Sequence, residues 1–156
     1  MKRFPYLLLT LILAACSSID CPVNNLVESL YQVCDSTGEN VKMLDTLSVY
    51  TTRADGEQVL LNKGAGLSQF HLQVSYSHPE DILVFCFDLV SAKVRVTDTV
   101  WIKKEDHPHF ESVDCNSAFF HTITDLKCTH HYIDSIVIIN PSIDYNYETV
   151  HFRMHI

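Results

Sequence analysis

The chain is short of basic residues. Eleven lysines and arginines stand against 19 aspartates and glutamates, which gives a formal net charge of −8 at pH 7. A surface with this excess of negative charge repels phosphate backbones and anionic lipid headgroups. The composition therefore argues against nucleic-acid binding and against peripheral membrane docking by the protein surface.

The chain also lacks the short motifs that mark common catalytic and cofactor sites. It contains no Gly-x-Ser-x-Gly elbow, no His-Glu-x-x-His pair and no phosphate-binding loop. No two cysteines are spaced as Cys-x-x-Cys, so thiol oxidoreductase chemistry has no support. We expect no cofactor, no metal and no catalytic residue, and a non-enzyme; a hydrolase acting on envelope polymers is the weakest of three hypotheses.

Only one apolar run is long, and it lies at the start of the chain. After Lys2 and Arg3, residues 4–15 are almost wholly apolar. A membrane-spanning helix needs about 20 apolar residues, so this shorter run is typical of a cleavable secretory signal instead. It ends in Leu13-Ala14-Ala15-Cys16, which resembles the lipobox of bacterial lipoproteins.

Cys16 is therefore predicted to receive the lipid and to become the mature N-terminus. Acyl chains contribute about 0.8 kcal/mol per buried methylene, so the membrane is expected to be held through the lipid anchor only. Ser17 follows the cysteine, and by resemblance to known sorting rules it favours the outer membrane. Whether the protein faces the periplasm or the cell surface stays open.

The rest of the chain has the patterning of one β domain. We expect residues 1–15 to be the signal peptide, 16–25 the lipidated cysteine and short tether, and 26–156 a single domain. Alternating apolar and polar residues predict strands at 70–76 and 150–156, the latter with His151 facing outward. The fold predicted is mostly β: a two-sheet sandwich, immunoglobulin-like in the broad sense, of about eight or nine short strands.

Three further segments refine this expectation. Asp55-Gly56 predicts a hairpin turn between strands near 47–50 and 58–61. Residues 82–89 and 133–139 are apolar at nearly every position, which predicts central strands covered on both faces. Residues 117–126 have apolar residues at helical spacing, but their threonines favour a strand.

Three triplets of aspartate, a hydroxyl residue and an aliphatic residue open apolar runs. Aspartate followed by serine or threonine commonly ends a turn where a strand starts. The triplets also resemble the sequons at which Bacteroidota attach O-glycans to exported proteins, and the two interpretations stay open. They are Asp45-Thr46-Leu47, Asp98-Thr99-Val100 and Asp134-Ser135-Ile136.

Six cysteines less the lipidated one leave an odd number, so at least one stays unpaired. Cys86 lies inside an apolar run and is the expected free thiol. The other four flank predicted strands whose length separates their ends by roughly 25 Å, whereas a disulfide needs Cα atoms within about 7 Å. Crosswise bridges are therefore predicted, either Cys21 to Cys115 with Cys34 to Cys128 or the exchanged set.

Nine histidines invite a metal hypothesis, but only His107 and His109 have suitable spacing. Residues two apart on a strand lie about 6.6 Å apart and can chelate one ion. A third ligand would have to come from His121, His130 or His131, yet no spacing matches a known zinc signature. A metal- or small-ligand-binding protein that uses His107 and His109 is the alternative function.

The mature chain resembles an uncharacterised family of small Bacteroidota envelope lipoproteins. The resemblance rests on segments 21–25, 45–49, 110–115 and 129–136. It implies a lipid-anchored β domain without an assigned activity, and it favours a bridge between Cys21 and Cys115. The preferred function is a non-catalytic binding or structural module of the envelope, with an envelope protein or a glycan as partner.

The anchor can be tested by replacing its cysteine. The variant Cys16→Ala should lose membrane fractionation, because no acyl chain can be attached at position 16. The measurement is the distribution of the full-length protein between soluble and membrane fractions of the producing cell. A variant that stays with the membranes would contradict the prediction.

Overall fold

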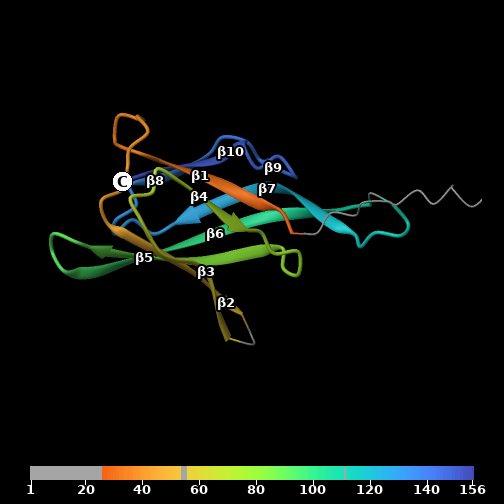
Figure 1. Cartoon of the computed structure of the whole chain (residues 1–156), viewed down its shortest axis with the longest axis horizontal. Helices are drawn as coiled ribbons and strands as arrows, with labels where there is room; N and C mark the ends of the chain where they lie inside the picture. The colour runs from red at the N-terminus through yellow and green to blue at the C-terminus, as the bar shows by residue number, and fades with distance from the viewer. Residues whose placement is uncertain (1–25, 54–55, 111) are drawn as a thin grey trace, which may run out of the picture.

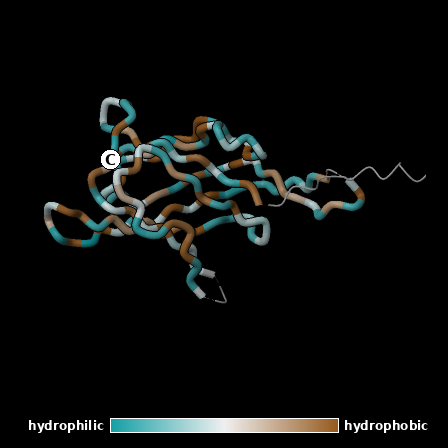
Figure 2. The backbone as a smooth tube through the Cα atoms, viewed as in Figure 1, coloured by the Kyte–Doolittle hydropathy of each residue, from teal (hydrophilic) through white to brown (hydrophobic). Residues whose placement is uncertain are grey.

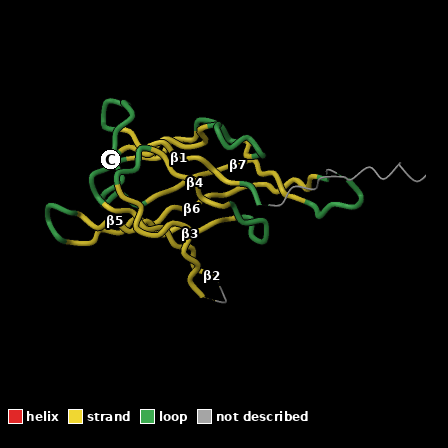
Figure 3. Tube along the Cα trace, in the orientation of Figure 1, coloured by secondary structure: helices red, strands yellow, loops and turns green. Residues whose placement is uncertain are grey.

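The computed structural model describes residues 26–53, 56–110 and 112–156, which form ten strands and no helix (Figure 3). No helix in this part of the chain could cross a membrane. The strands make two sheets, whose bounds and orders follow (Figure 1). The first sheet runs β4 (Gln69–Gln73), β1 (Glu28–Cys34), β10 (Val150–His155), β8 (Ser135–Ile138); the second runs β3 (Gly56–Ala65), β2 (Thr46–Arg53), β5 (Glu80–Leu89), β6 (Val94–His109), β7 (Ala118–Cys128), β9 (Ser142–Ile143).

The predicted two-sheet sandwich is confirmed, with more strands than expected. Neighbouring strands pair antiparallel except β1 and β10, which are parallel. Strand β4 has the expected alternation, since Phe70 and Leu72 are buried between exposed polar neighbours. Figure 2 shows brown and teal segments following one another along the strands, as a sheet with one inner face requires.

A cluster of aromatic rings fills the space between the sheets. Tyr31 of β1 stacks on Phe70 of β4 at 5.0 Å and on Phe152 of β10 at 4.7 Å. Phe85 of β5 reaches across from the other sheet, with its ring 6.0 Å from Tyr31. Each ring is at least nine-tenths buried, and burial of one such side chain contributes about 2 kcal/mol. These contacts fix how the two sheets face each other.

Two other segment predictions are confirmed. Residues 118–128 form strand β7, paired with β6 over most of its length. Strands β2 and β3 form the expected hairpin, in which Tyr50 pairs with Val59 and Arg53 with Gly56. The predicted turn residue Asp55 lies outside the described residues.

The prediction that residues 82–89 and 133–139 are covered on both faces is wrong. Strand β5 is central in its sheet, yet its Ile82 is 38% exposed; β8 is an edge strand, whose Val137 is 46% exposed. The sandwich has only two layers, so the outward face of every strand meets solvent. Apolar residues on that face do not contribute to the core.

The prediction that His151 faces outward is also wrong, because its ring is fully buried. The pairing of β1 with β10 shifts register between Leu30 and Tyr31. At this irregularity the backbone N–H of Leu30 donates to Nδ1 of His151 at 3.0 Å. The imidazole thus replaces a carbonyl oxygen as the acceptor that this N–H would otherwise lack.

The Asp98 carboxylate connects the two sheets at one end. It lies on β6, is fully buried, and accepts from Thr129 Oγ1 at 2.6 Å. Its Oδ1 also accepts from the backbone N–H and the Nδ1 of His131, at 2.8 and 3.0 Å. Its Oδ2 accepts from the N–H groups of Tyr132 and Ile133, at 2.8 and 3.0 Å. The loop that leaves β7 for β8 is therefore wrapped around one buried carboxylate.

These hydrogen bonds also determine the ionisation of Asp98. Burial alone would raise its pKa, but the donation from Thr129 and from three backbone N–H groups outweighs burial and lowers the pKa to about 2. The carboxylate is therefore charged across the physiological range. A charged acceptor of five hydrogen bonds holds this loop more firmly than a neutral group would.

The variant Asp98→Asn should lower the free energy of unfolding by roughly 3 kcal/mol, because an amide cannot accept from donors on both sides. Urea unfolding measures this, with Asp134→Asn as the matched control. Asp134 is exposed, so its variant should stay within about 0.5 kcal/mol of the native protein.

The same pair of variants tests the role of charge. The pKa of Asp98 is lower in the folded protein than in the unfolded chain. The stability that its charge contributes is therefore complete above pH 3.8 and is lost as pH falls towards 2. Equal losses of stability in the two variants would contradict the assignment.

Candidate functional site

Three of the four described cysteines are free thiols: Cys34, Cys86 and Cys128. The expectation for Cys86 is confirmed, and the predicted bridging of Cys34 or Cys128 is wrong. Cys34 ends β1 in the four-stranded sheet, Cys128 ends β7 in the six-stranded sheet, and no bridge joins the two thiols. Cys115 is disulfide-bonded; Cys21 lies outside the described residues, so a bridge between these two stays a prediction.

His107 and His109 lie at the end of β6, and each has another partner. Nε2 of His107 is 3.0 Å from the Thr122 hydroxyl. The His109 ring stacks on Phe120 at 4.3 Å and meets the edge of Tyr145. Within the described ranges, no three His, Cys, Asp or Glu side chains are grouped to hold a metal ion. The third ligand that the metal hypothesis required is therefore missing from this part of the chain.

The three histidines proposed as that third ligand lie on the other face of the sheet, in the case of His121, or at the other end of β6, in the case of His130 and His131. Nδ1 of His121 is 2.6 Å from Asp106 Oδ1, and the residue is 2% exposed. Nδ1 of His130 is 3.2 Å from the Ile133 carbonyl, and His131 donates to Asp98 at the other end of β6. Their positions explain the failure, because each histidine is committed to a structural hydrogen bond.

A cluster of buried charged groups lies on the inner side of the β6–β7 pair. Lys104 Nζ donates to the His78 carbonyl at 2.6 Å and lies 3.1 Å from Asp81 Oδ2. Two pairs further along the ladder, Asp106 and His121 are directly opposite. Burial lowers the pKa of His121 against the opposing effect of Asp106, and nearby Lys104 lowers it further.

Burial limits the reactions in which this cluster can take part. Lys104 and His121 are 4% and 2% exposed, so a substrate in solution cannot reach either side chain. The ion pair instead ties the loop between β4 and β5 to β6, since Ser75 N–H also donates to Asp81. A buried ion pair that carries additional hydrogen bonds is typical of a structural brace.

The outer face of the six-stranded sheet presents apolar side chains to solvent. Tyr50 pairs with Val59 on one side and with Val84 on the other, while Ile82 pairs with Trp101. Directly opposed residues share a face, and so do residues two apart on a strand. These five residues therefore form one continuous strip across four strands, which we call the outer-face row.

The outer-face row is accessible along its length. Val59 is 52% exposed and Ile82 is 38% exposed, while the other three residues are partly exposed. Aromatic residues are enriched where proteins bind other molecules, and a contiguous apolar patch on a monomer commonly marks an interaction site. The signal in the sequence was the run 82–89, which is more apolar than a strand with one buried face requires.

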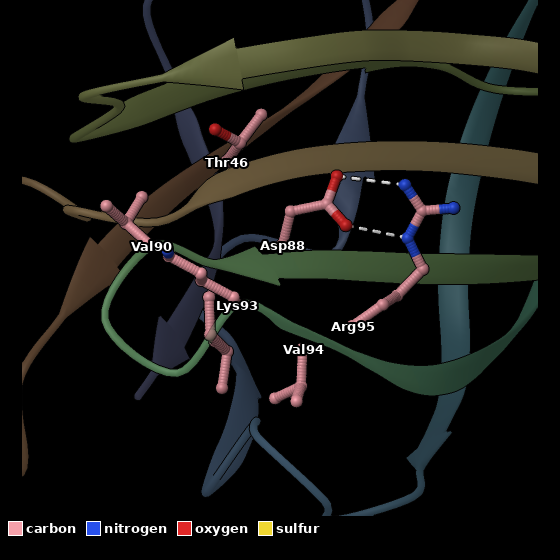
Figure 4. A pocket seen from close by; sticks show the side chains of 7 residues that line it. Thr46, Asp88, Val90, Lys93, Val94 and Arg95 are labelled. Carbon is pink, nitrogen blue, oxygen red and sulfur yellow. Dashed lines mark hydrogen bonds and ion pairs between the residues drawn. The ribbon is translucent and has the colours of Figure 1, made fainter.

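A charged pair borders the same face near the β5–β6 turn. The Arg95 guanidinium donates two hydrogen bonds to the Asp88 carboxylate, at 2.7 and 2.9 Å (Figure 4). They line an open depression of about 520 Å³ together with Thr46, Leu89, Val90, Lys93 and Val94. The hydrogen bonds from Arg95 lower the pKa of Asp88, so this pair is ionised and its charges neutralise each other.

The three aspartate triplets have structural roles in the folded protein. Asp98 is fully buried, and Asp45 accepts from the Val90 N–H at 2.9 Å and from the Tyr132 hydroxyl at 2.7 Å. Tyr132 also donates its N–H to Asp98, so two triplets hold the same loop. The turn interpretation is the one these contacts favour, and the hydroxyl residues that would carry a glycan, Thr46, Thr99 and Ser135, are all only partly exposed.

Comparisons with known proteins give one match. A family model matches residues 46–156, which include β2 to β10, and the family is described as one of unknown function. No curated protein and no solved structure matches the chain.

The two buried histidines make stability depend on pH. Burial lowers the pKa of both His121 and His151, although Asp106 acts against this at His121, and Ser142 and Asp144 do so at His151. Unfolding lets both rings take up protons, so stability is complete above pH 6.5 and falls as pH drops below it. The expected slope approaches about 1.4 kcal/mol per pH unit for each histidine.

Urea unfolding between pH 8 and 5 measures this slope. His151→Gln should reduce it, whereas His78→Gln, at an exposed histidine, should leave it unchanged. Equal slopes in all three proteins would contradict the assignment.

Proposed function

The chain belongs to DUF6452, a family of unknown function, and we propose that it is a lipid-anchored, non-catalytic binding module of the bacterial cell envelope. The outer-face row is the binding surface. The observation that carries the proposal is that row, in which a tyrosine, a tryptophan and three aliphatic side chains are exposed together on one rigid sheet.

The anchor places this module at the outer membrane. The basic start, the apolar run and Leu13-Ala14-Ala15-Cys16 support lipidation at Cys16, and Ser17 supports outer-membrane sorting. A lipid anchor suits a binding module, because it keeps the domain at the membrane without committing any protein surface to that task.

We propose a non-catalytic role because three titratable groups that could do chemistry are buried. Lys104, Asp98 and His121 are buried and hydrogen-bonded to neighbouring backbone or side chains. Catalytic acids, bases and nucleophiles must reach a substrate in a cleft. These three groups are instead enclosed between the sheets.

The chemistry of the row favours a protein partner over a glycan. Val59, Val84 and Ile82 offer aliphatic contacts, which match apolar side chains better than hydroxyl-rich sugars. The formal charge of −8 favours a partner with basic residues around its own apolar strip, since complementary charges speed encounter and orient the two surfaces. An envelope protein with these features is the expected partner.

The proposal is tested by site-specific photocrosslinking in cells. Benzoylphenylalanine at Ile82 or Val59 should give one discrete adduct with an envelope protein, because both positions are exposed to solvent within the outer-face row. The matched control is the same probe at Gln73, which is exposed on the four-stranded sheet.

A second substitution makes the test specific. Adding Val84→Asp should abolish the adduct formed at Ile82, since a charge in the middle of the row opposes apolar contact. The absence of any discrete adduct, or the same adduct from Gln73, would contradict the proposal.

A further inference from the structure

The turn between β6 and β7 presents apolar side chains at one end of the sandwich. Strand β6 ends at His109 and β7 begins at Ala118, and in Figure 1 the connecting turn projects from the end opposite the C-terminus. Phe110 is 66% exposed and Val113 is fully exposed. We call Phe110 and Val113 the hairpin tip. Apolar residues at the end of a projecting turn contribute nothing to the core.

The described chain begins at this same end. The Val74 N–H donates to the carbonyl of Val27, just before β1. Two residues further on, Tyr76 stacks on Phe119 of β7 with ring centroids 5.2 Å apart. Phe119 is paired with Pro108 at the base of the hairpin. Residues 26 and 27 therefore lie beside the hairpin from which the tip projects.

The proposed lipid is thus attached close to the tip. Nine residues lie between Cys16 and Leu26, and the ten steps from one to the other span at most about 35 Å in an extended chain. Cys115, within the turn, is disulfide-bonded. If Cys21 is its partner, the free leash from Cys16 shortens to about 17 Å, which is less than the thickness of one bilayer leaflet with its headgroups.

We propose that the hairpin tip rests in the lipid surface to which the chain is anchored, with Phe110 and Val113 entering the headgroup region. This inference depends on the lipid anchor of the proposed function, and it adds a second, protein-made contact with the membrane. It refines the expectation that the membrane is held through the lipid only.

The charge around the tip limits how deep this contact goes. Asp114 lies beside Val113 and is exposed, and the whole chain is acidic. Anionic headgroups would repel this end, so the contact suits a surface of uncharged or zwitterionic lipids. The tip therefore orients the domain, and the acyl chains retain it.

The orientation has a consequence for the binding surface. Leu44 and Val90 lie at the other end of the sandwich, since Val90 is in the β5–β6 turn and donates to Asp45, next to Leu44. With the tip in the membrane, that end points away from it. The outer-face row lies on the side of the sandwich between the two ends, where a partner can reach it.

Fluorescence at single tryptophans tests the orientation of the full-length, lipidated protein. Trp101 is the only tryptophan of the chain and is replaced by phenylalanine in every sample. One variant then carries Val113→Trp, a second Phe110→Trp, and the matched control Leu44→Trp, whose site is 88% exposed. The probe is a phosphatidylcholine vesicle, with and without dibrominated acyl chains.

The expected result is a blue shift and about twofold quenching by brominated lipid for Val113→Trp and Phe110→Trp. Leu44→Trp should be unchanged, because its position points into water. If all three variants sediment with vesicles but none is quenched, the anchor stands and the hairpin contact is wrong. If the lipidated protein does not sediment at all, the proposed anchor fails and the hairpin contact fails with it.

Discussion

The buried carboxylate of Asp98 is the interaction on which the arrangement of the two sheets depends. The chain must leave the six-stranded sheet after β7 and enter the four-stranded sheet at β8, and the loop between them exposes backbone N–H groups that no strand can satisfy. Asp98 accepts from three of them, at His131, Tyr132 and Ile133. One ionised side chain thereby replaces a run of missing ladder bonds and fixes where the second sheet begins.

A second set of buried charged groups holds strands and loops together at the opposite end of the sandwich. Lys104 of β6 pairs with Asp81 of β5 and donates to the His78 carbonyl in the loop after β4, and Asp106 with His121 connects β6 to β7. Because both ends of the sandwich are braced from inside, the strands between them present a rigid outer surface. The outer-face row and the hairpin tip are two of the apolar features that this framework leaves outside, and they are where we place binding and membrane contact.

Much of the fold could be predicted because a strand with one buried face has a period of two residues. This pattern identified β4, and the threonines of residues 118–128 correctly favoured a strand over a helix. The prediction failed in strands that have apolar residues on the outward face as well as on the core face, as at Ile82 and Val137. It failed again at His151, because a register shift in β1–β10 turned that ring inward.

The sequence by itself determined the fold class and the lack of known catalytic motifs, since each depends on local pattern or composition. It also provided the anchor hypothesis, through four consecutive residues that end at Cys16. Only the tertiary structure decided which sites are possible. It placed Cys34 and Cys128 in different sheets, put His107 and His121 on opposite faces of one sheet, and paired Tyr50 with Val84 and Ile82 with Trp101. These relations depend on strand order and register, which pair residues far apart in the chain and leave no periodic signal in the sequence.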